Sequence, residues 1–445
     1  MRARRPLARL LPSLAALLLL GCGREVRTGN VLVIVVDDVG TELLASYGSD
    51  DPVATPNLDR LAADGVVFDT AWANPLCSPT RALVMTGRHA FRTGVGGVVT
   101  PHTAALPLEE VTLPEAVAAA RGDEVATAAF GKWHLGNGRV GGAASPNHAG
   151  WQHFSGTLGN LVGRATYREY EAVVDGQPVT RRGYATSHTV DDALEWIGVQ
   201  DRPWLAYVAF HAAHASFHAP PAALIATDLT NALPVEQDPR PYFRAMIEAL
   251  DTELGRLLDG LGGAREETTV LFLSDNGTTP HVIANEAQAA RAKGSLFEGG
   301  LRVPLIAAGR GVADPGRRVT APVGAIDVFA TACDLLGVDP QAALPARAVL
   351  DSRSFLPLLE EPSAAATRAT LYAEVFAPNG DDPTEGSRAI RGPRFKLIED
   401  LDGQPTALFD LLEDPQETRN LLEDEGAARE RETLQRALRA LHAGH

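Results

Sequence analysis

Four short apolar runs, each ending in a polar cluster, constrain the fold of this chain more than any other feature. They are "NVLVIVV" before "DD", "VATAAF" before "GKWHLG", "WLAYVAF" before "HAAHASFH", and "TTVLFL" before "SDNG". Continuous apolar runs of this length, without alternation, are typical of central strands that helices cover on both faces. The sequence therefore predicts a buried sheet that contains these four strands.

Helical patterns lie between the runs. Residues 54–65 contain a Thr-Pro start signal, and residues 242–263 end in two glycines. Alternating strands and helices predict an α/β fold with a large, mostly parallel sheet flanked by helices. Ligands of such sheets bind beyond the carboxyl ends of the strands, where all four polar clusters fall. We therefore expect the clusters to share one site.

The pattern changes after about residue 340. "ATLYAEVFA", "SRAIRGPRFKLIED" and "TALFDLLEDP" read as strands separated by Gly/Pro turns, and a charged helix follows. We expect an α/β domain that carries the site over residues 22–340, and a smaller α+β domain with an antiparallel sheet over 341–445. Residues 138–186 and 212–240 read as long irregular loops that shape a substrate mouth.

The first 23 residues, "MRARRPLARLLPSLAALLLLGCG", combine a basic start, a leucine-rich middle and a small residue before Cys22. The apolar run is short for a bilayer span and is typical of an export signal. "LLGC" resembles a bacterial lipobox, which predicts a lipoprotein signal peptide over residues 1–21 and a lipid anchor on Cys22. The protein would then face the periplasm or the cell exterior. A plain signal peptide with an incidental Cys22 is the alternative.

Charge and cysteine content argue against two classes of protein. Removal of residues 1–21 would take four arginines with it and shift the formal net charge from -16 to -20. Such a surface repels polyanions, so we do not expect nucleic acid as a partner. The 445 residues include three cysteines, one of them Cys22, so a disulfide scaffold is not what holds the fold together.

Three carboxylates and one amide stand at the ends of two predicted strands, on Asp37, Asp38, Asp275 and Asn276. Oxygen-only ligands favour Ca²⁺ or Mg²⁺ over zinc. Taken singly, these residues are also common turn formers that close strands. Their convergence at one edge of the sheet favours a metal site.

Two further segments supply basic groups. Lys132 and His134 are two residues apart, so both side chains point to the same face of an extended segment. Lys293 precedes a glycine-rich turn and could reach an anion, although a lone lysine is also an ordinary surface residue.

Three histidines, His211, His214 and His218, form another cluster. Their spacings of three and four would permit zinc on a helix. We favour a general acid among them, because histidine titrates near working pH.

Cys77 stands where a helix begins, since the three residues after it are good helix openers and Gly87 supplies the stop. A helix N-terminus holds anions and activates a nucleophile. Arg81, one turn on, lies on the same side of the helix. Cysteine phosphatases place five residues between their cysteine and arginine, whereas three stand here, so that interpretation fails.

The segment "CSPTR" is the C-x-P-x-R signature of the sulfatases, and "ALVMTGR" matches the extension of that signature. "VLVIVVDDVG", "FGKWHLG", "LSDNG", "KGSLFEGGLRVP" and "LFDLLEDPQETRNL" resemble further sulfatase motifs, in the same order. The chain is therefore similar, along nearly its whole mature length, to the formylglycine-dependent, arylsulfatase-like members of the alkaline phosphatase superfamily.

The resemblance implies that a formylglycine-generating enzyme oxidises Cys77 to Cα-formylglycine, whose hydrate is the nucleophile. The implied Ca²⁺ ligands are Asp37, Asp38, Asp275, Asn276 and the modified Cys77. The implied sulfate-binding groups are Arg81, Lys132 and Lys293, and His134 contacts the formylglycine hydroxyl. Aligning "FHAAHAS" with the family's "FQAPHTP" selects His214 as the acid that protonates the leaving oxygen, with Ala213 and Ser216 in place of two prolines.

The activity implied by the resemblance is hydrolysis of a sulfate monoester, on an aryl alcohol or a carbohydrate. A formylglycine-dependent phosphonate or phosphodiester hydrolase is the second hypothesis. A non-catalytic lipoprotein that binds sulfated glycans is the third.

Overall fold

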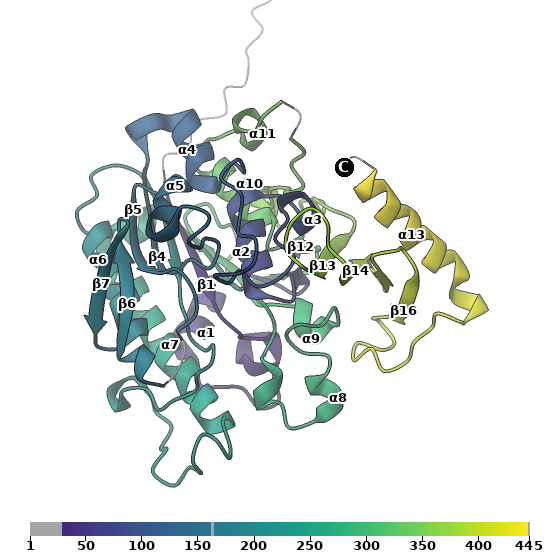
Figure 1. Cartoon of the computed structure of the whole chain (residues 1–445), viewed down its shortest axis with the longest axis horizontal. Coiled ribbons are helices and arrows are strands. Elements are labelled where there is room, and N and C mark those ends of the chain that lie inside the picture. The colour runs from purple at the N-terminus through teal and green to yellow at the C-terminus, as the bar shows by residue number, and fades with distance from the viewer. Residues whose placement is uncertain (1–28, 162–163, 347, 444–445) are drawn as a thin grey trace, which may run out of the picture.

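The computed structural model describes residues 29–161, 164–346 and 348–443, and its largest element is a mixed sheet of ten strands (Figure 1). In spatial order the strands are β11 (Arg317–Val319), β2 (Gly65–Phe68), β10 (Leu305–Gly309), β9 (Thr268–Ser274), β1 (Asn30–Val36), β8 (Trp204–Ala209), β4 (Ala126–Lys132), β5 (His153–Thr157), β6 (Glu169–Val174) and β7 (Gln177–Arg182).

The four apolar runs form neighbouring parallel strands at the centre of this sheet. β9, β1, β8 and β4 lie side by side, and β5 continues the parallel set. Val36 lies opposite Ser274, and Val35 lies opposite Ala209, so the carboxyl ends of the strands meet at one edge. Antiparallel strands flank this set, with β10 beside β9 and β6 beside β5. The prediction of a large, mostly parallel sheet is confirmed.

Helices cover both faces of the sheet, which explains why its central strands are apolar along their whole length. One face carries α1 (Pro56–Ala63), α6 (Ala185–Ile197) and α7 (Arg240–Gly260). The opposite face carries α2 (Cys77–Thr86), α4 (Leu113–Arg121) and α10 (Asp327–Leu335). Successive residues of β1 point alternately to the two faces, and residues 31–36 are all buried.

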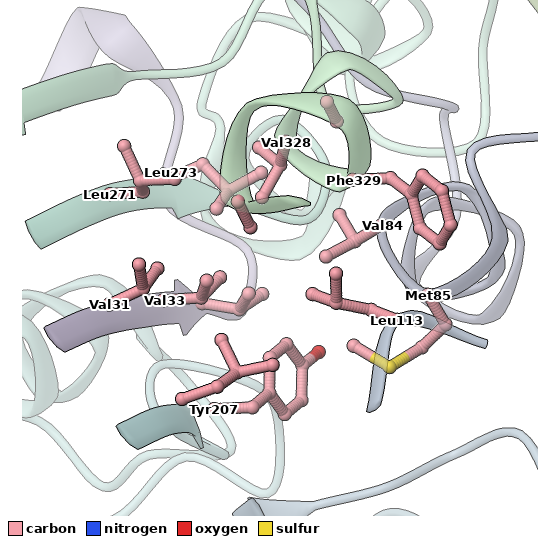
Figure 2. Packing of buried hydrophobic residues seen from close by; sticks show 14 of the residues in the cluster. Val31, Val33, Val84, Met85, Leu113, Tyr207, Leu271, Leu273, Val328 and Phe329 are labelled. Carbon is pink, nitrogen blue, oxygen red and sulfur yellow. The ribbon is translucent and has the colours of Figure 1, made fainter. Parts of the chain in front are cut away.

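Figure 2 shows the packing that anchors α2. Val31 and Val33 of β1 lie in one buried cluster with Val84 and Met85 of α2 and with residues of β9, α4 and α10. Burying a side chain of this size contributes about 1.5–3 kcal/mol. The helix that begins with Cys77 is therefore fixed against the centre of the sheet.

Shorter elements fill the connections. They are the paired strands β3 (Ala71–Trp72) and β12 (Val323–Gly324), and the helices α3 (Ala90–Thr93), α5 (Ser145–His148), α8 (Glu286–Ala289), α9 (Glu298–Leu301), α11 (Pro340–Ala343) and α12 (Leu356–Glu360).

The expectation of irregular structure over residues 138–186 is wrong in part, because β5, β6 and β7 lie there. β6 and β7 form a hairpin through Asp175 and Gly176, both of which have positive φ. Much of this hairpin is exposed to solvent, which gives it the polar composition of a loop. Residues 212–239 are irregular apart from one short 3-10 helix, and α7 begins at Arg240.

The C-terminal segment forms a separate antiparallel sheet, as predicted. Its strands are β13 (Leu371–Ala377), β14 (Glu385–Arg391), β15 (Phe395–Asp400) and β16 (Pro405–Asp410), paired in chain order. The terminal helix α13 (Ala428–His442), yellow in Figure 1, packs Leu434 and Leu438 against one face. The domain boundary at residues 340/341 stays a prediction.

This small sheet is held against the larger part of the protein near Cys77. Lys396 of β15 is fully buried and forms ion pairs with Glu417 at 2.7 Å and with Glu298 of α9 at 3.4 Å. The main-chain N–H of Glu374 in β13 donates to Oδ1 of Asn74 at 3.1 Å. Because Asn74 lies three residues before Cys77, the second sheet supports the loop that leads into α2.

The contact between β13 and α3 contains a buried carboxyl group, that of Glu374. The main-chain N–H of Phe91 donates to one of its oxygens at 2.9 Å, and the Tyr372 hydroxyl donates to the other at 3.0 Å. Burial raises the pKa of Glu374 from its ordinary 4.5 to about 7. Between these pH values the folded protein therefore keeps a proton that the unfolded chain has lost.

We expect the stabilising contribution of Glu374 to be complete below about pH 4.5 and to be lost as the pH rises through about 7. A pKa difference of this size corresponds to about 3 kcal/mol. Urea unfolding at mildly acidic and mildly alkaline pH, on the wild type and on Glu374→Gln, measures it. The Gln variant cannot titrate and should lose this part of the pH dependence. Identical pH profiles for the two proteins would contradict the prediction.

The predicted signal peptide, residues 1–21, and the predicted lipid site, Cys22, lie outside the described residues. Among the helices that the structure describes, none combines the length and the apolar character needed to cross a bilayer.

Candidate active site

Cys77 is the first residue of α2, and only 1% of its surface is exposed. The helix ends at Gly87 as predicted, where a φ of 65° closes it in the left-handed conformation. The Sγ atom of Cys77 lies 3.2 Å from Nδ1 of His134. Burial raises the pKa of the Cys77 thiol. An unmodified Cys77 therefore stays protonated and is a weak nucleophile.

Four oxygen-bearing side chains meet near Cys77 because they follow two neighbouring strands. Asp37 and Asp38 come directly after β1, and Asp275 and Asn276 come directly after β9. All four side chains are buried. Asp38 has a φ of 65°, which turns the chain immediately after the strand. Its Oδ1 atom accepts a hydrogen bond from Nδ2 of Asn276 at 2.7 Å.

Three of these side chains carry a buried oxygen without a hydrogen-bond partner, namely Oδ1 of Asp37, Oδ1 of Asp275 and Oδ1 of Asn276. Burying an acceptor without a donor costs about 1–3 kcal/mol, so such atoms are rare in folded proteins. Carboxylate and amide oxygens are the ligands that Ca²⁺ and Mg²⁺ prefer. The side chains present therefore fit a hard divalent cation.

Three cationic side chains balance the carboxylates. Nε and one terminal nitrogen of Arg81 donate to Oδ2 of Asp275 at 3.0 and 2.7 Å. Nζ of Lys132 donates to Asp37, and Nζ of Lys293 donates to Asp38. Arg81 and Lys132 are fully buried, whereas the Lys293 side chain is 13% exposed. Of the three cations, Lys293 is therefore the one that solvent reaches.

The close charges move the pKa values of the carboxylates apart. Burial alone would raise the pKa of Asp37, but Lys132 and the neighbouring cations hold it well below its ordinary value. Burial raises the pKa of Asp38 despite the opposing charge of Lys293. Burial and the charge of Asp37 together raise the pKa of Asp275 to about 6. Burial therefore works against the negative charges of Asp38 and Asp275, and further positive charge beside them would stabilise both.

His134 lies just after β4, and its backbone conformation places its ring beside Cys77. Its φ is 61°, and its main-chain N–H donates to the carbonyl of Leu158 at 3.0 Å. Burial, reinforced by the charges of Lys132 and Arg81, lowers the pKa of His134 well below its ordinary value. The ring beside Cys77 is therefore neutral, with one nitrogen lone pair free to accept a hydrogen bond.

His214 is the histidine of the second cluster that lies at the carboxylates. One ligand atom from each of Asp37, Asp38 and His214 lies within 4.8 Å of the others. Nδ1 of His214 lies 2.6 Å from the carbonyl oxygen of Ala215. Because a carbonyl oxygen can only accept a hydrogen bond, Nδ1 carries a proton. Nε2 is therefore the nitrogen that can gain or lose a proton. Burial lowers the pKa of His214 to about 4, although Asp37 opposes the shift.

His211 and His218 have other partners. Nε2 of His211 lies 2.7 Å from the Thr157 hydroxyl. Burial lowers the pKa of His211 to about 3. The ring of His218 packs on Tyr167, with a centroid separation of 4.3 Å. Residues 211–218 are irregular rather than helical, so the three histidines do not share a helix face. The structure sets His214 apart from the other two, and its role as the acid stays a prediction.

The sequence interpretation missed Thr157 and Tyr167, which contact the histidine segment. Both lie in the stretch that was expected to be irregular. Thr157 is the last residue of β5 and therefore ends at the same edge as the other clusters. The short run "HFSGT" is too polar to stand out as a central strand. Only the position of Thr157 at the end of a strand could have indicated that it belongs to the site.

A cavity of about 1050 Å³ lies near this edge of the sheet, although none of the site residues named above lines it. Its wall includes Thr41 and Thr278, which lie three residues after Asp38 and two after Asn276. Arginine and carboxylate side chains line much of the remaining wall. Apolar side chains such as Leu43, Tyr47 and Phe243 share the wall, and the cavity is large enough for a sugar or an aryl group.

Comparison with known proteins agrees with this geometry. The family model described as Sulfatase matches residues 29–338, and the one described as N-sulphoglucosamine sulphohydrolase, C-terminal, matches residues 291–444. Arylsulfatase A of Homo sapiens is 31% identical over 462 residues, which cover 91% of this chain and 86% of that protein. N-acetylgalactosamine-6-sulfatase of Canis lupus familiaris is 31% identical over 375 residues, covering 76% and 67%.

Solved structures share the fold. Ps i-CgsB in complex with k-i-k-neocarrahexaose has a TM-score of 0.74 at 24% identity, over 92% of this chain and 93% of that chain. A protein in complex with its substrate D-glucosamine-2-N,6-O-disulfate has a TM-score of 0.73 at 21% identity, over 94% and 98%. The Sulfatase model spans more than half of the sequence, and arylsulfatase A passes 30% identity over most of it. The chain therefore belongs to the sulfatase family and is a hydrolase of sulfuric esters.

Proposed function

We propose that this protein hydrolyses sulfate monoesters of aryl alcohols or carbohydrates, with Cys77 converted to Cα-formylglycine and with Ca²⁺ as its metal. The observation that carries the proposal is the convergence of three unpartnered buried oxygens, those of Asp37, Asp275 and Asn276, near Cys77. Asp38 and the modified residue 77 would complete the metal site, and Mg²⁺ is the other hard cation that fits.

Formylglycine and the metal ion would supply two kinds of chemistry. Formylglycine at position 77 would supply a hydrated aldehyde as nucleophile, and Ca²⁺ would supply fixed positive charge beside the sulfate oxygens. Arg81, Lys132 and Lys293 add three further positive charges at the same place. Fixed charges of this kind stabilise the more highly charged transition state more than the ester, which is the source of rate enhancement.

Two histidines would move the protons. Nδ1 of His134 lies 3.2 Å from Sγ of Cys77, so it is placed to accept a proton from a hydroxyl carried at position 77. Nε2 of His214 would donate a proton to the leaving oxygen. Positive neighbours contribute to the low pKa of His214. An anionic sulfate bound beside the ring would raise that pKa and favour the protonated form.

The cavity of about 1050 Å³, whose wall includes Thr41 and Thr278, supports a substrate with a sizeable alcohol part. The relatives named arylsulfatase A and N-acetylgalactosamine-6-sulfatase support aryl and sugar sulfates as the first classes to assay. We further propose that the protein is exported and anchored by a lipid on Cys22, and that a formylglycine-generating enzyme acts on it during maturation. The N-terminal motif and "CSPTR" support these two points.

The test uses protein produced with a formylglycine-generating enzyme, and peptide mass spectrometry of the segment around Cys77 first establishes its conversion. Release of sulfate from aryl sulfates and sulfated monosaccharides is then measured beside hydrolysis of aryl phosphodiesters. We expect conversion at Cys77 and faster cleavage of sulfate esters. Faster phosphodiester cleavage would favour a phosphodiesterase. An unmodified thiol in protein from its native host would favour a non-catalytic sulfate-binding protein.

A further inference from the structure

Tyr167 contacts two residues of the loop that carries His214, both through its hydroxyl oxygen. It is the last residue of a short 3-10 helix, Arg164–Tyr167, and its side chain is fully buried. Its hydroxyl donates to the carbonyl oxygens of His211 and of His214, each at 2.9 Å. One proton is therefore shared between two acceptors, which fixes the two carbonyls relative to each other.

The hydroxyl of Tyr167 is a permanent donor. Burial raises the pKa of this phenol well above its ordinary value, so the group stays protonated at every working pH. Its ring also packs on His218, which lies at the far end of the same loop. Tyr167 thus holds the histidine loop at His211, His214 and His218.

The remaining hydrogen bonds of the loop show what Tyr167 adds. Asp37 fixes the first part of the loop, because its main chain bonds to Ala212 at 3.1 Å and to Ala213 at 2.7 Å. The next residue is His214, whose main-chain N–H donates to the carbonyl of His211 at 2.8 Å and whose own carbonyl accepts from Tyr167. The ring of His214 is oriented by the bond between its Nδ1 and the carbonyl of Ala215. A shift of the backbone at residue 214 would therefore turn the ring and move Nε2.

We propose that Tyr167 is a positioning residue that holds Nε2 of His214 in line with the leaving oxygen of the ester. The inference rests on the proposed function of His214 as general acid. Tyr167 acts through the His214 backbone, and its partners in the loop are the two carbonyls and the His218 ring. Its removal should therefore lower the rate of leaving-group departure and leave substrate affinity nearly unchanged.

A general acid matters most when the leaving alcohol is a poor one, because a stable leaving anion needs no proton. Tyr167→Phe keeps the ring and removes the hydroxyl. We expect kcat to fall by less than about 3-fold for nitrophenyl sulfate and by about 10-fold or more for alkylphenyl and sugar sulfates, within the range that general acids contribute. KM should stay within about 2-fold, because the hydroxyl bonds to the protein backbone.

The experiment compares the slope of log kcat against the pKa of the leaving phenol for four versions of the calcium-loaded enzyme. These are the wild type, Tyr167→Phe, His214→Ala and Tyr184→Phe. Tyr184 is the matched control, since it is a buried neighbouring tyrosine whose hydroxyl has no hydrogen-bond partner in the loop. We expect a steeper slope for Tyr167→Phe and His214→Ala, and the wild-type slope for Tyr184→Phe.

The outcomes separate this inference from the proposed function. A steeper slope for His214→Ala with an unchanged slope for Tyr167→Phe would overturn the role of Tyr167 alone. An unchanged slope for His214→Ala would overturn the acid assignment and the inference with it. A uniform loss for Tyr167→Phe on all substrates would show a purely structural role and also overturn it. 4-Aminophenylalanine at position 167 restores a donor in a foldable protein and should return the slope toward the wild-type value.

Discussion

The variant Cys77→Ala should have no measurable sulfatase turnover, with kcat reduced by about 10⁴-fold or more. The reason is that position 77 carries the proposed nucleophile, and a methyl group cannot be converted to an aldehyde hydrate. Alanine is a good helix former, and loss of one buried sulfur atom should lower the free energy of unfolding by only about 1 kcal/mol. Sulfate release and thermal unfolding measure the two effects.

Two companion variants make this result specific. Cys77→Ser should also be inactive in a host that converts only cysteine. Cys333→Ala is the matched control, because Cys333 is equally buried but lies in α10, within the hydrophobic core. It should keep nearly full activity. Turnover by Cys77→Ala above a small fraction of the wild-type rate would remove Cys77 as the nucleophile.

The second large effect is expected for Asp275→Asn, which keeps the shape of the side chain and removes its charge. The side chain now has one oxygen bonded to Arg81 and one unpartnered oxygen that would face the metal. Without the carboxylate, a divalent ion loses one of three negative ligands, and Arg81 loses its closest counter-charge. We expect calcium affinity and kcat/KM each to fall by about 100-fold or more.

Calorimetric titration of metal-free protein with Ca²⁺ measures the affinity, and sulfate release at saturating Ca²⁺ measures the rate. Asp327→Asn is the control, because Asp327 is also a buried aspartate paired with an arginine, Arg368, but lies in α10 outside the carboxylate cluster. It should lower stability and leave calcium affinity unchanged. An unaltered calcium titration for Asp275→Asn would take this residue out of the metal site.

Much of the fold could be predicted because its central strands are buried on both faces. Burial on both faces produces continuous apolar runs, and such runs can be recognised in the sequence without any knowledge of the neighbours. The same kind of reasoning from local sequence also predicted the ends of α2, because Pro79 and Gly87 mark a helix start and stop. It failed for β5, β6 and β7, because a short strand and a solvent-exposed hairpin carry the polar composition of a loop.

Some features of the candidate site could likewise be predicted from the sequence, and others could not. The chain order alone put Asp37, Asp38, Asp275 and Asn276 at the ends of strands, and the parallel sheet required those ends to share an edge. The resemblance to the family's "FQAPHTP" selected His214 among the three histidines. The structure then set His214 apart, since it lies at the carboxylates while His211 and His218 have other partners. What separates them is the set of partners that the fold brings to each ring.

The sequence by itself determined the central strands, the residue types of the site and the edge of the sheet where they gather, because these depend on local periodicity and on strand direction. Only the tertiary structure decided which cation faces which carboxylate, which partners surround each histidine, and that Tyr167 holds the loop. Arg81 and Asp275 are 194 residues apart in the chain, and Tyr167 and His214 are 47 apart. Contacts over such separations depend on how the helices and loops pack as a whole, and no local pattern in the sequence encodes that packing.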